Sequence, residues 1–139
     1  MLSNLPVHAN IAAFDLDRAK RWYAEKLGLT PVFEAEGDTL IYGDGEVLFT
    51  IYVSPNAGTA KNTVATWVVP NLPATMAQLR ARGVVFEEYD LEDFKTVDGV
   101  MTDPDGGKGA WFLDSEGNTL ALAQHGASVA GALMAKPTS

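Results

Sequence analysis

One pattern occurs twice along this chain of 139 residues and restricts its fold more than any other feature. Residues 7–28 and residues 63–83 each contain an apolar stretch, then a segment with helical spacing of apolar side chains, then a glycine. Gly28 and Gly83 end the two copies. A unit that recurs along a chain indicates two copies of one structural module, so we expect a pseudo-symmetric pair.

The two predicted helices have recognisable ends. The first spans roughly residues 16–27, where Asp15 or Asp17 can accept hydrogen bonds from the free N–H groups at its start. The second spans residues 72–82. Each helix stops at a glycine, which adopts the left-handed backbone of a helix end without strain.

Short strands surround the helices. In the first copy, apolar runs separated by turn residues predict strands at 7–14, 30–34, 39–42 and 47–53. In the second copy we expect strands at 63–69, 84–89 and 99–102, an acidic loop at 90–98, and a final hairpin. The first copy therefore has the order βαβββ, and the second begins the same way.

Residues 111–124, with the sequence WFLDSEGNTLALAQ, form the predicted final hairpin. Residues 115–118 are turn formers, and Gly and Asn tolerate the positive φ of a tight reversal. In the strand that follows, Leu120 and Leu122 share one face and Ala121 lies on the other. We expect the leucine face in the core and the face of Ala121 beside a cavity.

Three segments together resemble the vicinal-oxygen-chelate superfamily, which includes glyoxalase I, extradiol dioxygenases and bleomycin-resistance proteins. They are Asp-Leu-Asp-Arg-Ala at 15–19, the pairs Trp22-Tyr23 and Leu27-Gly28, and residues 114–122. The resemblance implies an α+β fold in which paired βαβββ modules form a curled sheet around a ligand cleft. One domain would then comprise a module at 5–54, a linker at 55–62 and a module at 63–124. The tail at 125–139 falls outside the resemblance, and its own residues predict a short apolar helix at 127–136 and a frayed end at 137–139.

In metal-dependent members of that superfamily, four side chains hold the metal, typically a histidine and an acid from each module. His8 lies where the first histidine ligand usually lies, but the other three positions fall at or near Thr50, Val64 and Ala121. Catalytic metal sites generally use three protein ligands, so we expect no metal and no cofactor. A site built from His8 with Glu46, Asp103 or His125 is an alternative that the spacing does not favour.

Composition excludes several classes of function. The chain has no cysteine, which excludes disulfides, thiolate metal sites and cysteine nucleophiles. Its formal net charge of −8 repels phosphate backbones, so we expect no nucleic-acid partner. No apolar run approaches the ~20 residues of a membrane span, and the first residues lack the features of a signal peptide. We therefore expect no membrane association and a cytoplasmic location.

Strand alternation predicts which side chains line the cleft. Thr50 and Tyr52 share one face of their strand, Thr66 lies on the matching face of another, and either Trp111 or Phe112 should border the cleft. Aromatic walls with a few polar groups suit small organic ligands, and in an acidic protein they suit cations. Core packing is the alternative interpretation of each aromatic residue.

We therefore predict a metal-free protein that binds a small aromatic or cationic molecule, as bleomycin-resistance proteins do in antibiotic resistance by sequestration. The predicted ligand-binding residues are Thr50, Tyr52, Thr66, Trp111 and Ala121. The alternative is a lyase, isomerase or dioxygenase in which His8 is a general base or part of an atypical metal site. His8 bonded to a neighbour without a catalytic role is a further interpretation. The resemblance also implies a homodimer.

Overall fold

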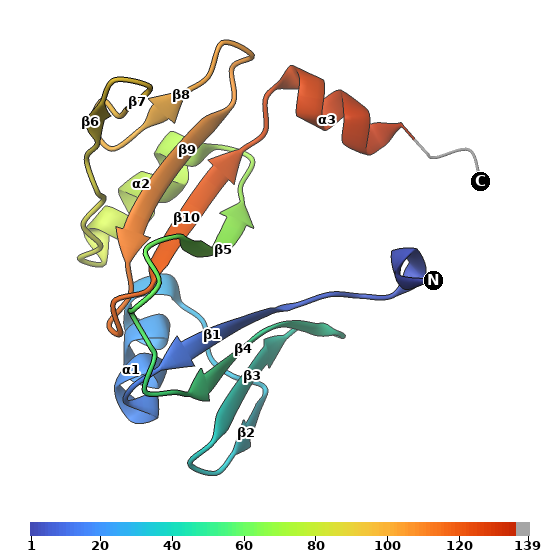
Figure 1. Ribbon diagram of the computed structural model, residues 1–139, viewed down its shortest axis with the longest axis vertical. Coiled ribbons are helices and arrows are strands. Elements are labelled where there is room, and N and C mark those ends of the chain that lie inside the picture. Colours follow the sequence, from blue (N-terminus) through green and yellow to red (C-terminus); the bar gives the residue numbers. More distant parts are fainter. Residues whose placement is uncertain (136–139) are drawn as a thin grey trace. The chain divides into compact units, whose positions relative to one another are not determined.

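The computed structural model describes residues 1–135, and these form two compact units (Figure 1). The first unit comprises Met1–Ala65 together with Leu113–Leu120. The second comprises Thr66–Phe112 and the residues from Ala121 onward. The turn of the final hairpin therefore belongs to the first unit, although it is far from the rest of that unit in sequence.

Helix α1 (Leu16–Leu27) confirms the first predicted helix and both of its ends. The Asp15 carboxylate accepts a hydrogen bond from the backbone N–H of Arg18 at 3.0 Å, which caps the N-terminus. Gly28 follows the helix with φ 71°. Ala19 and Tyr23 are fully buried and form the face of α1 that packs against the sheet.

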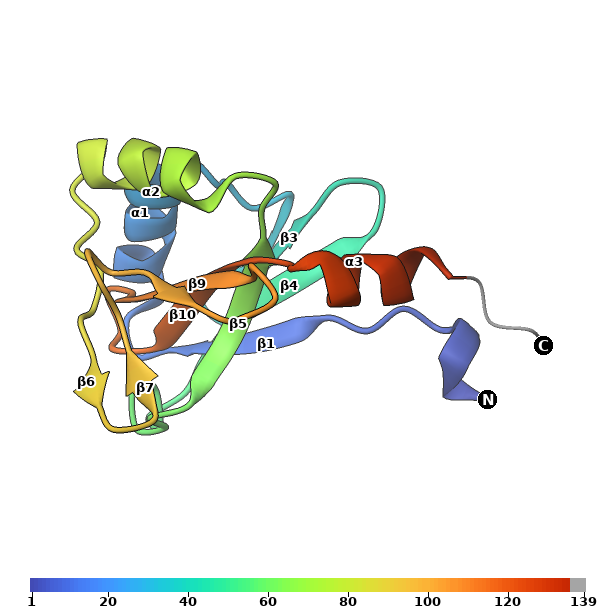
Figure 2. The ribbon, with the colours of Figure 1, turned by 90° about the horizontal axis from the view of Figure 1, so that it is seen from above.

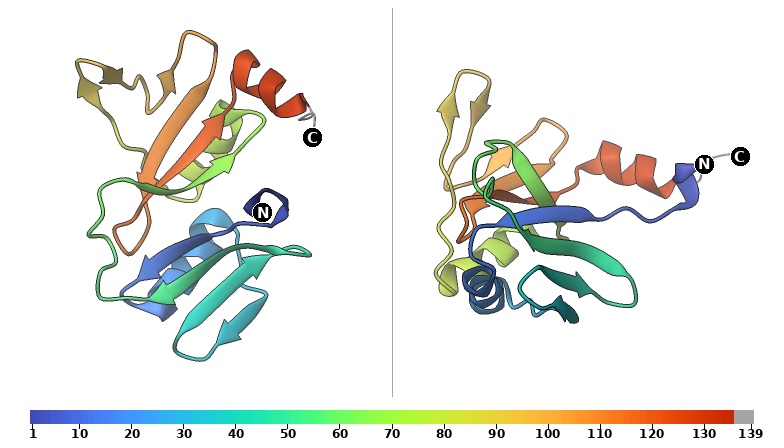
Figure 3. Two further views of the ribbon diagram at one scale, coloured as in Figure 1. Left: turned by 45° about the vertical axis from the view of Figure 1, so that its right-hand side comes forward. Right: turned by 60° about the horizontal axis from the view of Figure 1, so that its bottom comes forward.

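A four-stranded sheet supports α1 and has the order β1-β4-β3-β2 (Figures 1 and 3). Its strands are β1 (Ala9–Ala13), β2 (Phe33–Ala35), β3 (Thr39–Gly43) and β4 (Val47–Val53). The pair β1–β4 is parallel, and the other pairs are antiparallel. The ring of Tyr23 contacts those of Tyr42 and Phe49, each at 6.1 Å between centroids. One face of this sheet is thus the core of the first unit.

The second helix also begins and ends close to the prediction. Helix α2 (Leu72–Ala81) is capped by Asn71, whose side-chain oxygen accepts from the N–H of Ala74 at 3.1 Å. A second sheet has the order β5-β10-β9-β8, with strands β5 (Thr63–Val68), β8 (Met101–Thr102), β9 (Lys108–Leu113) and β10 (Thr119–Gln124). Phe86 packs edge-on against Phe112 at 5.5 Å, in the core of the second unit.

The segment between α2 and β8 differs from the prediction. The expected strand at 84–89 is wrong, because over these residues only Phe86 forms a bridge, with Phe112. The N–H of Val84 instead donates to the carbonyl of Leu79 and closes the end of α2. The expected acidic loop contains a small separate hairpin, β6 (Asp90–Leu91) and β7 (Phe94–Lys95).

The C-terminal part described by the structure is helix α3 (Ala127–Met134), as expected from the apolar tail. The predicted end of this helix at residue 136 and the expected frayed residues 137–139 lie outside the described residues. The Asp105 carboxylate accepts from both the N–H and the hydroxyl of Ser128, each at 2.9 Å. No residue of α3 is buried.

Among residues 1–135, three α-helices and two four-stranded sheets confirm the predicted α+β class with its βαβββ order. The only additions are the hairpin β6–β7 and the short turn η1 (Leu2–Asn4) found in this part of the chain. None of the helices over these residues has the length and apolar character needed to cross a membrane.

Candidate functional site

The face of the first sheet that does not pack on α1 carries three of the predicted site residues. We call it the open face of the first sheet and define it by alternation along β1 and β4 as His8, Asn10, Ala12, Leu48, Thr50 and Tyr52. His8 immediately precedes β1 and is exposed. The sheet therefore brings His8, Thr50 and Tyr52 to one surface, while their strand neighbours Phe49 and Ile51 are buried on the other side.

A short hydrogen bond fixes the polar centre of this open face. Thr50 pairs in register with Asn10, and its hydroxyl donates to the Asn10 side-chain oxygen at 2.6 Å. Thr50 is 9% exposed, whereas Asn10 is exposed and can offer its amide group to a ligand. The hydrogen bond of Asn10 to Thr50 was missed from sequence. The signal for it was that Asn10, two residues after His8, lies on the same face of the strand.

Tyr52 has space around its ring on the open face. Its neighbours in register are Ala12 on β1 and Thr39 on β3, both smaller than the ring between them. Tyr52 is 39% exposed, and Leu48 on the same face is 57% exposed. The surface therefore offers an accessible aromatic ring and an apolar side chain beside one polar pair, the composition expected of a small-molecule site.

The other predicted site residues belong to the second unit and lie on adjacent strands of its sheet. Thr66 on β5 is exposed, Trp111 on β9 is partly exposed, and Ala121 on β10 is 4% exposed. The Trp111 ring is in edge contact with Tyr89 at 5.9 Å and Phe94 at 5.0 Å. These two aromatic contacts were missed from sequence, because Phe94 lies in the segment expected to be a loop and Tyr89 lies at the end of an expected strand that does not form.

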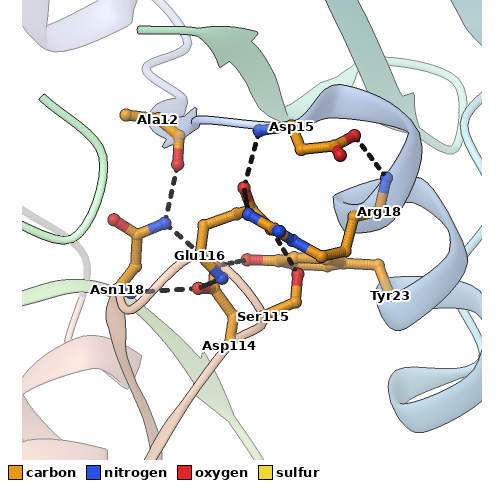
Figure 4. A network of polar contacts seen from close by, with 8 residues as sticks. All are labelled: Ala12, Asp15, Arg18, Tyr23, Asp114, Ser115, Glu116 and Asn118. Atoms are coloured by element: carbon orange, nitrogen blue, oxygen red, sulfur yellow. Dashed lines mark hydrogen bonds and ion pairs between the residues drawn. The ribbon is translucent and has the colours of Figure 1, made fainter. Parts of the chain in front are cut away.

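A polar network holds the turn of the final hairpin against α1 (Figure 4). Arg18 donates to both carboxylate oxygens of Glu116, from Nε at 2.8 Å and from the guanidinium Nη2 at 3.0 Å. The same carboxylate accepts from the N–H of Asp15 and from the hydroxyl of Ser115, each at 2.8 Å. The Glu116 side chain is 1% exposed, so a nearly buried charge receives four hydrogen bonds.

Asp114 is the second centre of this network. Its carboxylate accepts from the Tyr23 hydroxyl at 2.7 Å and from the Asn118 amide at 2.9 Å, as well as from backbone N–H groups of the turn. The Asn118 amide also donates to the carbonyl of Ala12 at 2.7 Å. The turn thus anchors the end of β1, one of the strands of the open face. The sequence predicted the turn but not these partners.

The pKa values of Glu116 and Tyr23 in this network are shifted in opposite directions. Burial alone would raise the pKa of Glu116, but the hydrogen bonds from Arg18, Asp15 and Ser115 outweigh it and lower that pKa to about 2. Burial raises the pKa of Tyr23, and the charge and hydrogen bond of Asp114 raise it further. At neutral pH the network therefore contains a charged Glu116 and a protonated Tyr23 that donates a hydrogen bond. These groups hold the turn in place.

The metal site of the resembled superfamily can be tested on the side chains present. Its four positions correspond to His8, Thr50, Val64 and Ala121, of which only His8 is a common ligand of a transition metal. Within residues 1–135, no three His, Asp or Glu side chains are grouped so as to hold an ion. These residues do not fit that metal site.

Comparison with known proteins gives one family match and several similar structures. Residues 6–122 match the family model described as Glyoxalase/Bleomycin resistance protein/Dioxygenase superfamily. No curated protein matches the sequence.

Three solved structures illustrate the shared fold. A glyoxalase/bleomycin resistance protein from Catenulispora acidiphila is 23% identical, with TM-score 0.64 and coverage of 88% of this chain and 99% of that one. A lactoylglutathione lyase from Agrobacterium tumefaciens is 14% identical, with TM-score 0.67 and coverage of 89% and 96%. A bleomycin-binding protein complexed with bleomycin is 20% identical, with TM-score 0.65 and coverage of 86% and 98%.

Proposed function

Because the chain belongs to the Glyoxalase/Bleomycin resistance protein/Dioxygenase superfamily, we propose that it binds a small aromatic or cationic molecule without a metal. Members of one superfamily differ in chemistry, so the proposal depends on the site of this chain. The observation that carries it is the open face of the first sheet. On this face the Thr50 hydroxyl donates to Asn10, and the Tyr52 ring is exposed. A chelating relative would have an acidic metal ligand near the position of Thr50.

The ligand-binding residues in this proposal are Thr50, Tyr52, Thr66, Trp111 and Ala121. The exposed rings would stack on an aromatic ligand, and the net charge of −8 favours a cationic one. The similar structure of a bleomycin-binding protein complexed with bleomycin supports small-molecule binding, and we propose that this binding sequesters the ligand, as in antibiotic resistance. We further propose that the chain works as a single domain in the cytoplasm.

Titration calorimetry with a panel of small molecules tests the proposal. Planar aromatic cations should bind the wild-type protein, and Tyr52→Ala should weaken that binding while leaving the melting temperature within a few degrees. A saturating ligand should also stabilise the fold, by about 2.7 kcal/mol at 100 times its dissociation constant. Binding restricted to anionic or purely aliphatic compounds would contradict the proposal.

The second candidate is an enzyme that uses His8, and the exposed imidazole together with the similar lactoylglutathione lyase structure favours testing it. A His8→Ala variant separates the two functions. If the protein is an enzyme, turnover of its substrate should be lost while binding is retained. If it is a binding protein, the variant should titrate like the wild type.

We also propose that the protein is a homodimer. Helix α3 supports this assembly, because Leu133 is 68% exposed and Met134 is 84% exposed on an apolar helix. Light scattering coupled to size exclusion should give twice the chain mass of 14.9 kDa. A mass of one chain at micromolar concentration would contradict the dimer.

A further inference from the structure

The hairpin β6–β7 is a self-contained element of the second unit. Its base is closed by Tyr89 and Thr96, where the N–H of Tyr89 donates to the Thr96 hydroxyl at 2.8 Å and the N–H of Thr96 donates to the Tyr89 carbonyl at 2.9 Å. Leu91 pairs with Phe94 across the hairpin. This two-stranded sheet is separate from the larger sheet, and it lies on the opposite side of β9 and β10 from α2 (Figure 2).

Three aromatic rings meet where this hairpin contacts β9. The centroids of Tyr89, Phe94 and Trp111 are 5.3, 5.9 and 5.0 Å apart in pairs, and the ring planes are inclined at 67°, 85° and 68°. All three residues are partly exposed. By contrast, Phe112 packs on the α2 side of the same strand and is fully buried. Core packing explains the position of Phe112. It does not explain why three partly exposed rings gather on the opposite face of β9.

The segment that contains Tyr89 and Phe94 is strongly acidic and carries six of the 18 acidic side chains of the chain. Residues 87–98 include six carboxylates and a single basic side chain, Lys95, whereas the whole chain has a net charge of −8. Burial raises the pKa of Tyr89, and the negative charge of the nearby Glu87 carboxylate raises it further. Two of the three partly exposed rings, those of Tyr89 and Phe94, therefore belong to a strongly acidic segment.

On the basis of the function proposed above, we propose that Tyr89, Phe94 and Trp111 form the site that recognises the cationic group of the ligand, an aromatic quaternary or protonated amine. A cation is attracted to a ring face within ~6 Å of the centroid. Because the three centroids are at most 5.9 Å apart, one ammonium group can satisfy this limit for all three rings.

The charged hairpin contributes in a second way. The tip residues Glu92 and Asp93 are exposed, so they attract a cation through the field of the hairpin. A neutral aromatic molecule gains the stacking contact but not this attraction. The site therefore discriminates in favour of the charged form of a planar ligand.

Calorimetry with three probes tests this site: N-methylquinolinium, the neutral analogue quinoline at pH 8, and tetramethylammonium. Phe94→Leu should weaken N-methylquinolinium binding by about 3- to 30-fold, the range expected of a cation–π contact. The loss for quinoline should be smaller. The control Phe14→Leu removes a ring that is 67% exposed in the first unit and should change neither affinity.

The double variant Glu92→Gln/Asp93→Asn should weaken binding of both cations several-fold and leave quinoline unaffected. Its matched control, Glu36→Gln/Asp38→Asn, removes the same charge from the turn between β2 and β3 and should have a smaller effect. Melting temperatures of all variants verify that they are folded.

The outcomes separate this inference from the proposed function. If N-methylquinolinium binds and Tyr52→Ala weakens it while Phe94→Leu does not, the aromatic cluster is not the cation site but the proposed function stands. If quinoline binds as tightly as N-methylquinolinium to every variant, cation recognition is wrong. If no probe binds the wild-type protein, both proposals are wrong.

Discussion

Two tyrosines in the core of the first unit have hydroxyl groups in opposite situations. The Tyr23 hydroxyl donates to Asp114 at 2.7 Å, whereas the buried Tyr42 hydroxyl has no hydrogen-bond partner among the described residues. Tyr23→Phe should lower the free energy of unfolding by about 1–3 kcal/mol, because it leaves a buried carboxylate short of a donor. Tyr42→Phe should leave it unchanged or raise it. Urea denaturation measures both, and similar losses in the two variants would contradict this account.

Glu116 links the same network to pH. Its pKa in the folded protein is about 2, below the ordinary value of 4.5, so its ionised form stabilises the fold above about pH 4.5. That contribution is lost as the pH falls towards 2. Glu116→Gln should therefore cost about 1–3 kcal/mol at pH 7, and the difference from wild type should shrink between pH 5 and pH 2. Urea unfolding at a series of pH values checks the trend, and a difference independent of pH would exclude this role.

The turn between β3 and β4 sets the register of the strand that carries Thr50 and Tyr52. Gly43 lies at a register shift between these strands, where a Cβ atom would overlap the carbonyl oxygen of Glu46. Gly45 has φ +80° but open space around it.

Gly45→Ala should cost about 1–2 kcal/mol for the left-handed backbone alone. Gly43→Ala should cost more and also weaken ligand binding, because the backbone of the turn must move. Urea unfolding and calorimetry of the two variants check this order. Equal stability and affinity in both would show that the turn does not control β4.

Local chemistry made most elements predictable from the sequence. Capping residues and glycines determine the ends of α1 and α2 to within a residue, and alternation correctly assigns Phe49 and Ile51 to the buried face of β4. The strand expected at 84–89 does not form: the N–H of Val84 closes the end of α2, and of these residues only Phe86 forms a bridge, with Phe112. The partners of Asp114 and Glu116 were also hidden, because they lie about 90–100 positions away in sequence.

The family resemblance identified from a few motifs is confirmed over residues 6–122. The predicted site residues are placed on strands of the two sheets, with His8, Thr50 and Tyr52 on one face as alternation required. Asn10 and Phe94 could not be ranked in advance. Their importance depends on a cross-strand hydrogen bond and on a hairpin packing against β9, both of which are tertiary contacts.

At the scale of the whole molecule, charge should govern which ligands bind. The net charge of −8 attracts a cation over a distance that salt shortens, from a Debye length of ~30 Å at 0.01 M to ~3 Å at 1 M. The affinity for N-methylquinolinium should therefore fall several-fold between low and high sodium chloride, while that for quinoline should stay constant. Calorimetry across a salt series measures this, and parallel curves for the two probes would contradict an electrostatic contribution.

The first unit is built from two segments that are far apart in sequence, and this affects how the protein folds during translation. Residues 113–120 supply Asp114 and Glu116 to a helix that left the ribosome nearly a hundred residues earlier. Until residues 113–120 are synthesised, Tyr23 and Arg18 of the nascent chain lack their hydrogen-bond partners. The N-terminal half therefore cannot complete its fold before that point of translation. A stop codon before the last two strands would therefore leave both halves of the polypeptide unfinished, not merely shorten its end.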